Sequence, residues 1–140
     1  MLFAIGYQGR SVQGLCEELA QRDVEVLIDV RERAWSNRPE FRKTALAQKL
    51  AAAGIEYQHI RDAGNPFRPR GGTTIDREEC LSNYQSYLTN NPKVLTTLLH
   101  MLTKRSALFC YESHTANCHR GVLIAELART YPALSCVEIE

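Results

Sequence analysis

The sequence predicts a single α/β domain over residues 1–140, with a Rossmann-like three-layer fold and a mainly parallel sheet. Three observations support this fold class. Short apolar runs alternate with segments of helical periodicity along the whole chain, which is typical of a sheet covered by helices on both faces. The run Val24–Val30 is almost continuously apolar, as strands buried on both faces are. The length is that of one domain with a sizeable core.

The first half of the chain is expected to hold three strands and two helices. Ser11 is a suitable N-cap for the first helix, and Gly54 stands where a helix commonly ends in a C′ glycine. A polar loop, RERAWSNRPEF, separates the second strand from the second helix. The expected elements are a strand at Leu2–Tyr7, a helix from Ser11 to about Arg22, a strand at Val24–Val30, a helix at Thr44–Gly54 and a strand at Ile55–Ile60.

The second half opens with a long segment, residues 61–77, that contains Gly, Pro and Arg without periodicity. Long loops of this kind inside a small domain are more often functional than idle. Helical pattern then fills residues 78–104, with a break near Asn90–Pro92 because the residue before proline disfavours the helix. A strand at Ser106–Glu112, a helix from Cys118 or His119 to Thr130, and a short strand at Ser135–Glu140 complete the prediction.

Composition limits the class of protein. The formal net charge is only +1, so the chain lacks the overall basic field of many nucleic-acid binders, although 13 of its 17 basic residues are arginine. The start of the chain does not resemble a signal peptide, and the apolar runs are far shorter than the ~20 residues that span a bilayer. We therefore expect a cytoplasmic protein without a membrane partner, whose five irregularly spaced cysteines are reduced thiols.

Polar residues gather where the predicted strands end. Asp29 and Arg31 end or follow the second strand, His59 lies near the end of the third, Glu112 ends the fourth, and Arg120 opens the helix after it. Ligands of open parallel sheets bind beyond the carboxyl ends of the strands. We expect these five side chains around one cleft.

The segment CYESHTANCHR, residues 110–120, admits three interpretations. Its cysteines and histidines are zinc ligands by type, but their spacing matches no standard finger or ribbon, so we expect no bound metal and no cofactor. As a strand–loop–helix unit it favours an anion cradle, with Arg120 donating to the anion and Cys118 carrying a lowered pKa. In the third interpretation Cys118 packs under the helix and Arg120 pairs with Glu112 or Asp29.

This arrangement of a cysteine and an arginine at the start of a helix resembles the catalytic loops of rhodaneses and cysteine phosphatases. LIDVR at residues 27–31 also resembles a rhodanese strand. The full signature of either family is missing. The sixth residues after Cys110 and Cys118 are Ala116 and Ile124 rather than arginine. A direct assignment to either family is therefore not made.

Four blocks, AIGYQGRS, VLIDVRERAWSNRPEF, LAAAGIEYQHI and LFCYESHTANCHRGVLIAELA, resemble the family called domain of unknown function 488 over almost the whole chain. The chain departs from that family's pattern at Gln8, where Ser is usual, at Ala34, where Pro is usual, and in DAGNPFRPRGG after the third strand. The resemblance implies a fold and a site but no activity. The positions it points to are Gly6, Tyr7, Asp29, Arg31, Ser36, Phe41, Tyr57, His59, Gly64, Cys110, Glu112, Cys118, His119 and Arg120.

The leading hypothesis is the binding or processing of a phosphate-bearing ligand, a nucleotide or nucleic acid. Ligand contacts are expected from Tyr7, Arg31, Ser36 and Arg120, and catalytic roles from Asp29, His59, Glu112, Cys118 and His119. On this hypothesis, replacing Arg120 by Ala should abolish ligand binding and leave the fold largely intact.

Two alternatives remain open at this point. One is a non-catalytic nucleic-acid-binding module that uses the arginine-rich loop 31–42, with Trp35 and Phe41 beside the charges. In the competing interpretation of that loop, its aromatic residues, Phe41 above all, attach it to the core. The other alternative is a thiol or sulfur-transfer protein that uses Cys118.

Overall fold

The computed structural model describes residues 1–67 and 76–140 and shows an α/β domain built on a five-stranded sheet. The strand order is β3-β2-β4-β1-β5, and every pairing is parallel. The strands are β1 (Leu2–Gly6), β2 (Val26–Asp29), β3 (Glu56–His59), β4 (Ser106–Cys110) and β5 (Cys136–Ile139). The predicted fold class is confirmed, and the described sheet is entirely parallel rather than mainly so.

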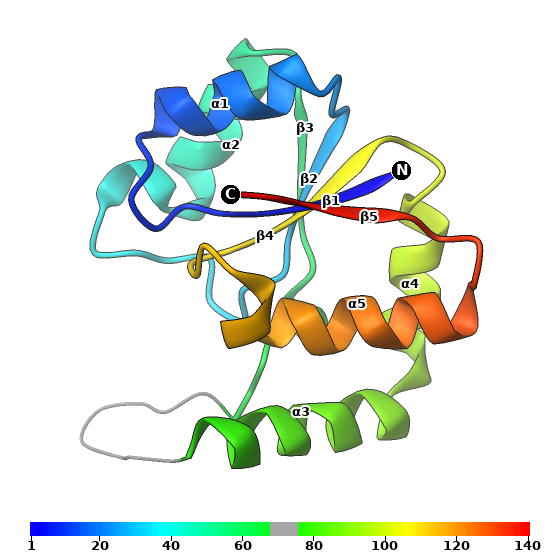
Figure 1. Cartoon of the computed structure of the whole chain (residues 1–140). Helices are drawn as coiled ribbons and strands as arrows, with labels where there is room; N and C mark the ends of the chain where they lie inside the picture. The colour runs from blue at the N-terminus through cyan, green and yellow to red at the C-terminus, as the bar shows by residue number, and fades with distance from the viewer. Residues whose placement is uncertain (68–75) are drawn as a thin grey trace.

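Helices cover both faces of this sheet (Figure 1). One face carries α1 (Val12–Gln21) and α2 (Lys43–Ala52), and the other carries α3 (Arg77–Asn90), α4 (Pro92–Met101) and α5 (His119–Thr130). None of these five helices is long and apolar enough to cross a lipid bilayer. All five cysteines lie in the described part of the chain and are free thiols.

Local sequence signals account for several helix ends. The Ser11 hydroxyl accepts a 2.9 Å hydrogen bond from the backbone N–H of Gly14 at the start of α1. Gly54, just beyond α2, has a φ of +77°, a conformation that glycine adopts without strain. The predicted break in the long helical segment lies at Asn91, between α3 and α4. Of the predicted loop 61–77, residues 68–75 lie outside the described residues.

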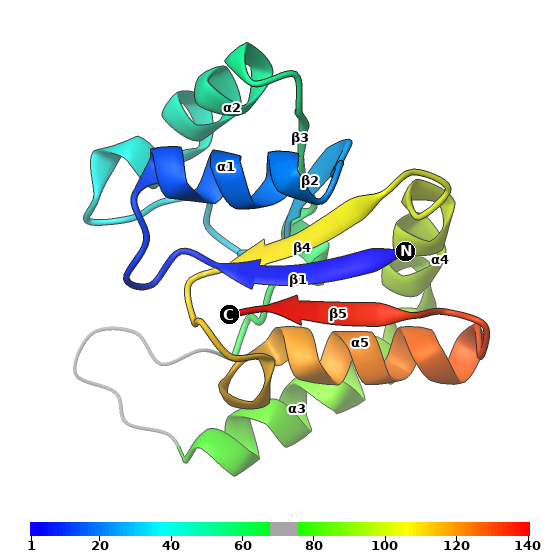
Figure 2. The same cartoon turned by 45° about the horizontal axis from the view of Figure 1, so that its top comes forward.

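The period of two along the strands divides the core between the two faces. Val26, Ile28 and Val30 pack against α3, α4 and α5, whereas Leu27 packs against α1 and α2. In the sheet register Asp29 lies beside Phe109, and Gly6 lies beside Cys110. The carboxyl ends of β1, β2 and β4 are therefore aligned, as the parallel arrowheads of β1 and β4 in Figure 2 illustrate.

The chain passes very close to Gly6 after it leaves β4. A Cβ added at Gly6 would lie 1.8 Å from the carbonyl oxygen of Glu112, so no larger residue fits without backbone movement. This close approach lets the segment after β4 fold over the end of β1. It then forms the short 3-10 turn Thr115–Asn117 (η3) before α5 begins.

Candidate functional site

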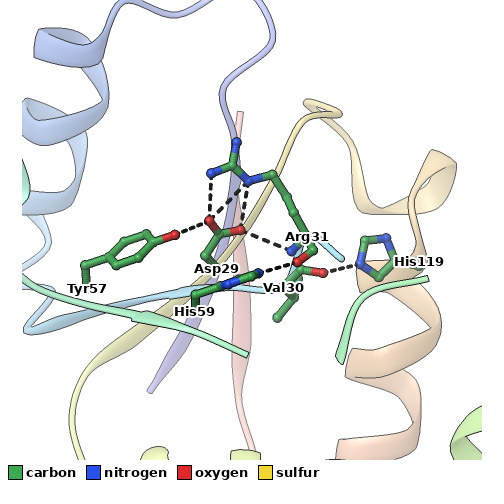
Figure 3. A network of polar contacts seen from close by, with 6 residues as sticks. All are labelled: Asp29, Val30, Arg31, Tyr57, His59 and His119. Atoms are coloured by element: carbon green, nitrogen blue, oxygen red, sulfur yellow. Dashed lines mark hydrogen bonds and ion pairs between the residues drawn. The ribbon is translucent and has the colours of Figure 1, made fainter. Parts of the chain in front are cut away.

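A buried ion pair lies at the carboxyl end of β2, on the face covered by α1 and α2 (Figure 3). The Asp29 carboxylate accepts hydrogen bonds from Arg31 Nε at 2.9 Å and Nη2 at 2.7 Å, and from the Tyr57 hydroxyl at 2.5 Å. Burial acts to lower the pKa of Arg31, but the hydrogen bond and charge of Asp29 outweigh it and raise that pKa. Burial and the Asp29 carboxylate together raise the pKa of Tyr57. Arg31 thus stays positively charged inside the protein, and the Asp29 carboxylate balances its charge.

Two histidines hold consecutive carbonyl groups at the end of the same strand. His59 Nε2 donates to the carbonyl oxygen of Arg31 at 2.7 Å, and His119 Nε2 donates to that of Val30 at 2.8 Å (Figure 3). A carbonyl oxygen only accepts, so each imidazole carries its proton on Nε2 when it is neutral. The Nδ1 atom of a neutral His119 therefore presents a lone pair.

That lone pair faces two cysteine thiols on the opposite face of the sheet. His119 Nδ1 lies 3.5 Å from Cys118 Sγ and 4.0 Å from Cys110 Sγ. A hydrogen bond from Cys110 lowers the pKa of Cys118, and the positive charge of Arg120 lowers it further, against the opposing effect of burial. The hydrogen bond to Cys118 and burial raise the pKa of Cys110. The pair thus favours a Cys118 thiolate beside a protonated Cys110.

Arg120 is the largest fully buried side chain of the described residues, with an exposed fraction of 0%. Its Nε donates to Cys118 Sγ at 3.4 Å, and its Nη2 donates to the backbone carbonyl of Glu112. The predicted partner, Glu112, is therefore contacted through its backbone. Because Arg120 fills core volume and holds this loop, replacing it by Ala is expected to destabilise the domain, contrary to the expectation from sequence.

The five residues expected around one cleft all lie at the carboxyl end of the sheet, but Asp29 and Arg31 belong to one cluster and Arg120 to another. Asp29 and Arg31 pack on the α1/α2 face, with Arg31 Cζ 5.0 Å from the centre of the Phe109 ring. Arg120 belongs to the Cys118 cluster on the other face. The backbone of Val30 and Arg31 links the two clusters through the two histidines. Catalytic roles for these side chains stay predictions.

Cys118 also lines a surface pocket of about 390 Å³ between α3 and α5. Gln85 of α3 and Glu126 and Arg129 of α5 contribute polar groups to its wall. Glu126 is buried, accepts a hydrogen bond from Gln85 at 3.4 Å, and forms an ion pair with Arg129. The pocket gives the Cys118 side of the site a route toward solvent.

The segment 31–42, called here the arginine loop, is held to the core by Phe41. This ring is fully buried and stacks on Tyr7, with ring centres 4.5 Å apart, which confirms that Phe41 attaches the loop to the core. Tyr7, expected as a ligand contact, is itself buried between Phe41 and Phe109. Ser36, expected in the same role, is also buried, and its hydroxyl accepts a 3.1 Å hydrogen bond from the backbone N–H of Arg38.

Trp35 is exposed at the surface of the arginine loop, with an exposed fraction of 55%. The guanidinium carbon of Arg42 lies 4.7 Å from the centre of the indole ring, and Arg42 Nε donates to the carbonyl oxygen of Ser36 at 3.0 Å. Arg42 is therefore fixed in place against Trp35, in a cation–π contact.

Sequence reasoning missed Tyr84 as part of the site. Its hydroxyl donates to the carbonyl oxygen of Ala63 at 2.6 Å, and its ring meets the His119 imidazole edge to face at 5.2 Å. No local motif in α3 marks this residue, because its role depends on how α3 packs against α5. For Cys110 the sequence did indicate a place in the site, because it is the last residue of a strand at the carboxyl edge of the sheet.

A family model described as domain of unknown function DUF488 matches residues 11–127. Among solved structures, the chain is similar to one described as "Putative phosphatase (DUF442)" from Shewanella putrefaciens CN-32, with a TM-score of 0.49 and 12% identity. The similarity covers 94% of this chain and 66% of that protein. No curated protein matches the sequence.

Proposed function

The chain belongs to the DUF488 family, and from that premise we propose that its arginine loop binds a phosphate-bearing ligand, specifically single-stranded nucleic acid. The observation that carries the proposal is the exposed Trp35 with Arg42 fixed against its ring. Proteins that bind single strands combine cationic side chains along the backbone with aromatic rings on which bases stack. Trp35 and Arg42 supply one of each at the same point of the surface.

Charge in the loop supports contact with phosphates. Besides Arg31, which pairs with Asp29, the arginine loop contains three basic and two acidic side chains. Arg33 is exposed, and Arg38 is half-exposed and paired with Glu40 at 3.2 Å. Exposed ion pairs of this type contribute little energy, so phosphate can compete for Arg38.

The loop is also held in one conformation, which reduces the entropy lost on binding. Arg38 Nη2 donates to the carbonyl oxygen of Arg10 at 2.6 Å, and its guanidinium carbon lies 4.4 Å from the centre of the Phe41 ring. The backbone N–H of Lys43 donates to the carbonyl oxygen of Ala34 at 2.9 Å and closes the loop onto the start of α2.

The buried arginines support this choice of surface. Arg31 Nη1 and Arg120 Nη1 have no hydrogen-bond partner among the described residues, but both atoms lie below the surface. A ligand would reach either atom only after side chains had moved. Arg33 is exposed on the arginine loop and needs no such movement.

Trp35 is the chain's single tryptophan, so intrinsic fluorescence reports directly on the loop. An oligothymidylate of about ten nucleotides should quench this fluorescence at low salt, because bases stack on the indole. With a labelled oligonucleotide and anisotropy detection, Trp35→Ala should weaken binding by about 5-fold to 150-fold, which corresponds to about 1–3 kcal/mol of lost stacking. Three phosphate contacts would give a slope of log affinity against log salt of about −2, and Arg33→Ala should reduce it by about 0.7.

Arg105 offers a matched control for Arg42. Its guanidinium carbon lies 5.2 Å from the centre of the Phe3 ring, but it stands at the amino end of β4, away from the arginine loop. Arg42→Ala should weaken oligonucleotide binding, and Arg105→Ala should leave it unchanged, with the melting temperature of each variant measured alongside. Absence of quenching and anisotropy change at low salt, or equal losses in the two variants, would refute the proposal.

A further inference from the structure

Three soft ligand atoms converge at the carboxyl end of β4. Cys110 is the last residue of β4, Cys118 is the N-cap of α5, and His119 is the first residue of α5. Their Sγ, Sγ and Nδ1 atoms all lie within 4.8 Å of one another, and all three side chains are buried. The spacing of the two cysteines along the sequence matches no standard zinc motif. The turn η3 nevertheless brings the chain back to the end of β4.

We propose that Cys110, Cys118 and His119 bind one zinc ion through Sγ, Sγ and Nδ1. Tetrahedral zinc with ligand distances of about 2.3 Å to sulfur and about 2.05 Å to nitrogen places sulfur and nitrogen ligands about 3.6 Å apart. The observed separations from His119 Nδ1 are 3.5 Å to Cys118 Sγ and 4.0 Å to Cys110 Sγ. A shift of a few tenths of an ångström would therefore complete the geometry.

The hydrogen bonding of His119 suits a metal ligand. Metal-bound histidines usually donate their second ring N–H to a carbonyl or carboxylate, which fixes the tautomer and the ring orientation. His119 Nε2 makes this bond to the carbonyl oxygen of Val30 at 2.8 Å, and the Tyr84 ring packs edge to face against the imidazole. The nitrogen that faces the two sulfurs is thus the one with the lone pair.

The surroundings suit a zinc-bound pair of thiolates. Arg120 Nε donates to Cys118 Sγ at 3.4 Å from a fully buried side chain that also bonds the Glu112 carbonyl. Arg120 is therefore a positioning residue for Cys118. Cys118 lines the pocket between α3 and α5, so a fourth, exogenous ligand of the zinc would come from that side.

Burial favours metal binding over direct thiol chemistry. The exposed fraction of Cys118 is 2%, and Cys110 is fully buried. A bulky electrophile could not approach Cys110 without displacing core side chains, whereas a single ion fits between the three ligands. The expectation from sequence that no metal binds here rested on the spacing of the ligands along the chain, but the fold brings the sulfur of Cys110 to face Cys118 and His119.

The test is cobalt and zinc titration of the reduced, chelator-treated full chain. Co²⁺ should bind at one ion per chain and produce thiolate charge-transfer absorption with tetrahedral d–d bands, and zinc should remove both. Cys110→Ser, Cys118→Ser and His119→Gln should lose or shift these bands. Cys16→Ser and Cys136→Ser, two cysteines outside the cluster, should keep them.

A second measurement uses only the wild-type chain, so it does not depend on whether the ligand variants fold. It compares the alkylation of Cys118 with and without zinc. Zinc should slow alkylation of Cys118 at least tenfold, as mapped by mass spectrometry, and leave Cys16 unaffected. The proposal would be overturned if the wild-type protein gave no cobalt bands, or if zinc did not change the alkylation rate of Cys118. Fast alkylation of Cys118 both with and without zinc would indicate a reactive thiol instead. The inference is independent of nucleic-acid binding, because Arg42→Ala should keep the cobalt bands.

Discussion

Asp29→Asn should destabilise the domain strongly because it removes the charge that balances the buried Arg31. Asp29 is fully buried and Arg31 has an exposed fraction of 3%, so water cannot replace the lost carboxylate. Removing one partner of a buried pair typically costs about 3–5 kcal/mol. A chain of 140 residues unfolds with an entropy near 0.3 kcal/mol per degree, so the melting temperature should fall by about 10–17 °C.

Thermal and urea unfolding of four proteins tests this reasoning: the wild type, Asp29→Asn, Arg31→Met and the double variant. Replacing both partners of a buried pair by uncharged groups is often close to neutral. The double variant should therefore be more stable than Asp29→Asn alone, with a favourable coupling of several kcal/mol. A loss below about 1 kcal/mol in Asp29→Asn, or additive losses in the double variant, would refute the account of this pair.

Three further outcomes are expected. Gly6→Ala should lower the unfolding free energy by about 1–3 kcal/mol or more, since its Cβ would meet the Glu112 carbonyl at 1.8 Å, and an unchanged urea midpoint would contradict this. Tyr84→Phe should lower it by about 1–3 kcal/mol in the same assay, because the Ala63 carbonyl loses a buried 2.6 Å hydrogen bond; a neutral variant would count against that bond. Burial and Glu138 raise the pKa of Cys136 to about 11, so its thiolate is scarcer at every pH below that value than in a free thiol of pKa about 8.5. Its alkylation near pH 8 should be at least about 100-fold slower than that of an unperturbed thiol by mass spectrometry, and a rate like that of free cysteine would disprove the shift.

Much of the fold could be predicted from local pattern. The apolar run Val24–Val30 predicted β2 because a strand buried on both faces needs apolar side chains in every position. Ser11 and Gly54 predicted helix ends because their effects are confined to one turn of backbone. The strand order could not be predicted, because the insertion of β4 between β2 and β1 depends on contacts far apart in the sequence.

The candidate site was predictable in position but not in arrangement. Strand ends marked Asp29 and Cys110 as residues of the carboxyl edge. The side-chain period of two could have separated Asp29 from Val30, and hence the ion pair from the thiol cluster, before the structure was known. The approach of Cys118 to Cys110 could not be read from sequence, because it depends on the path of residues 111–117 over Gly6.

The inner position of β1 has a consequence for the order of events during translation. Leu2 lies beside Ser106 of β4 and Cys136 of β5, so residues 2–6 leave the ribosome about a hundred residues before either neighbour exists. By contrast, β2 and β3 are partners separated by one helix, and they can pair early. Chains dominated by distant pairings fold slowly, with apolar segments exposed meanwhile. The apolar β1 segment therefore stays without its strand partners until β4 has emerged to pair with it.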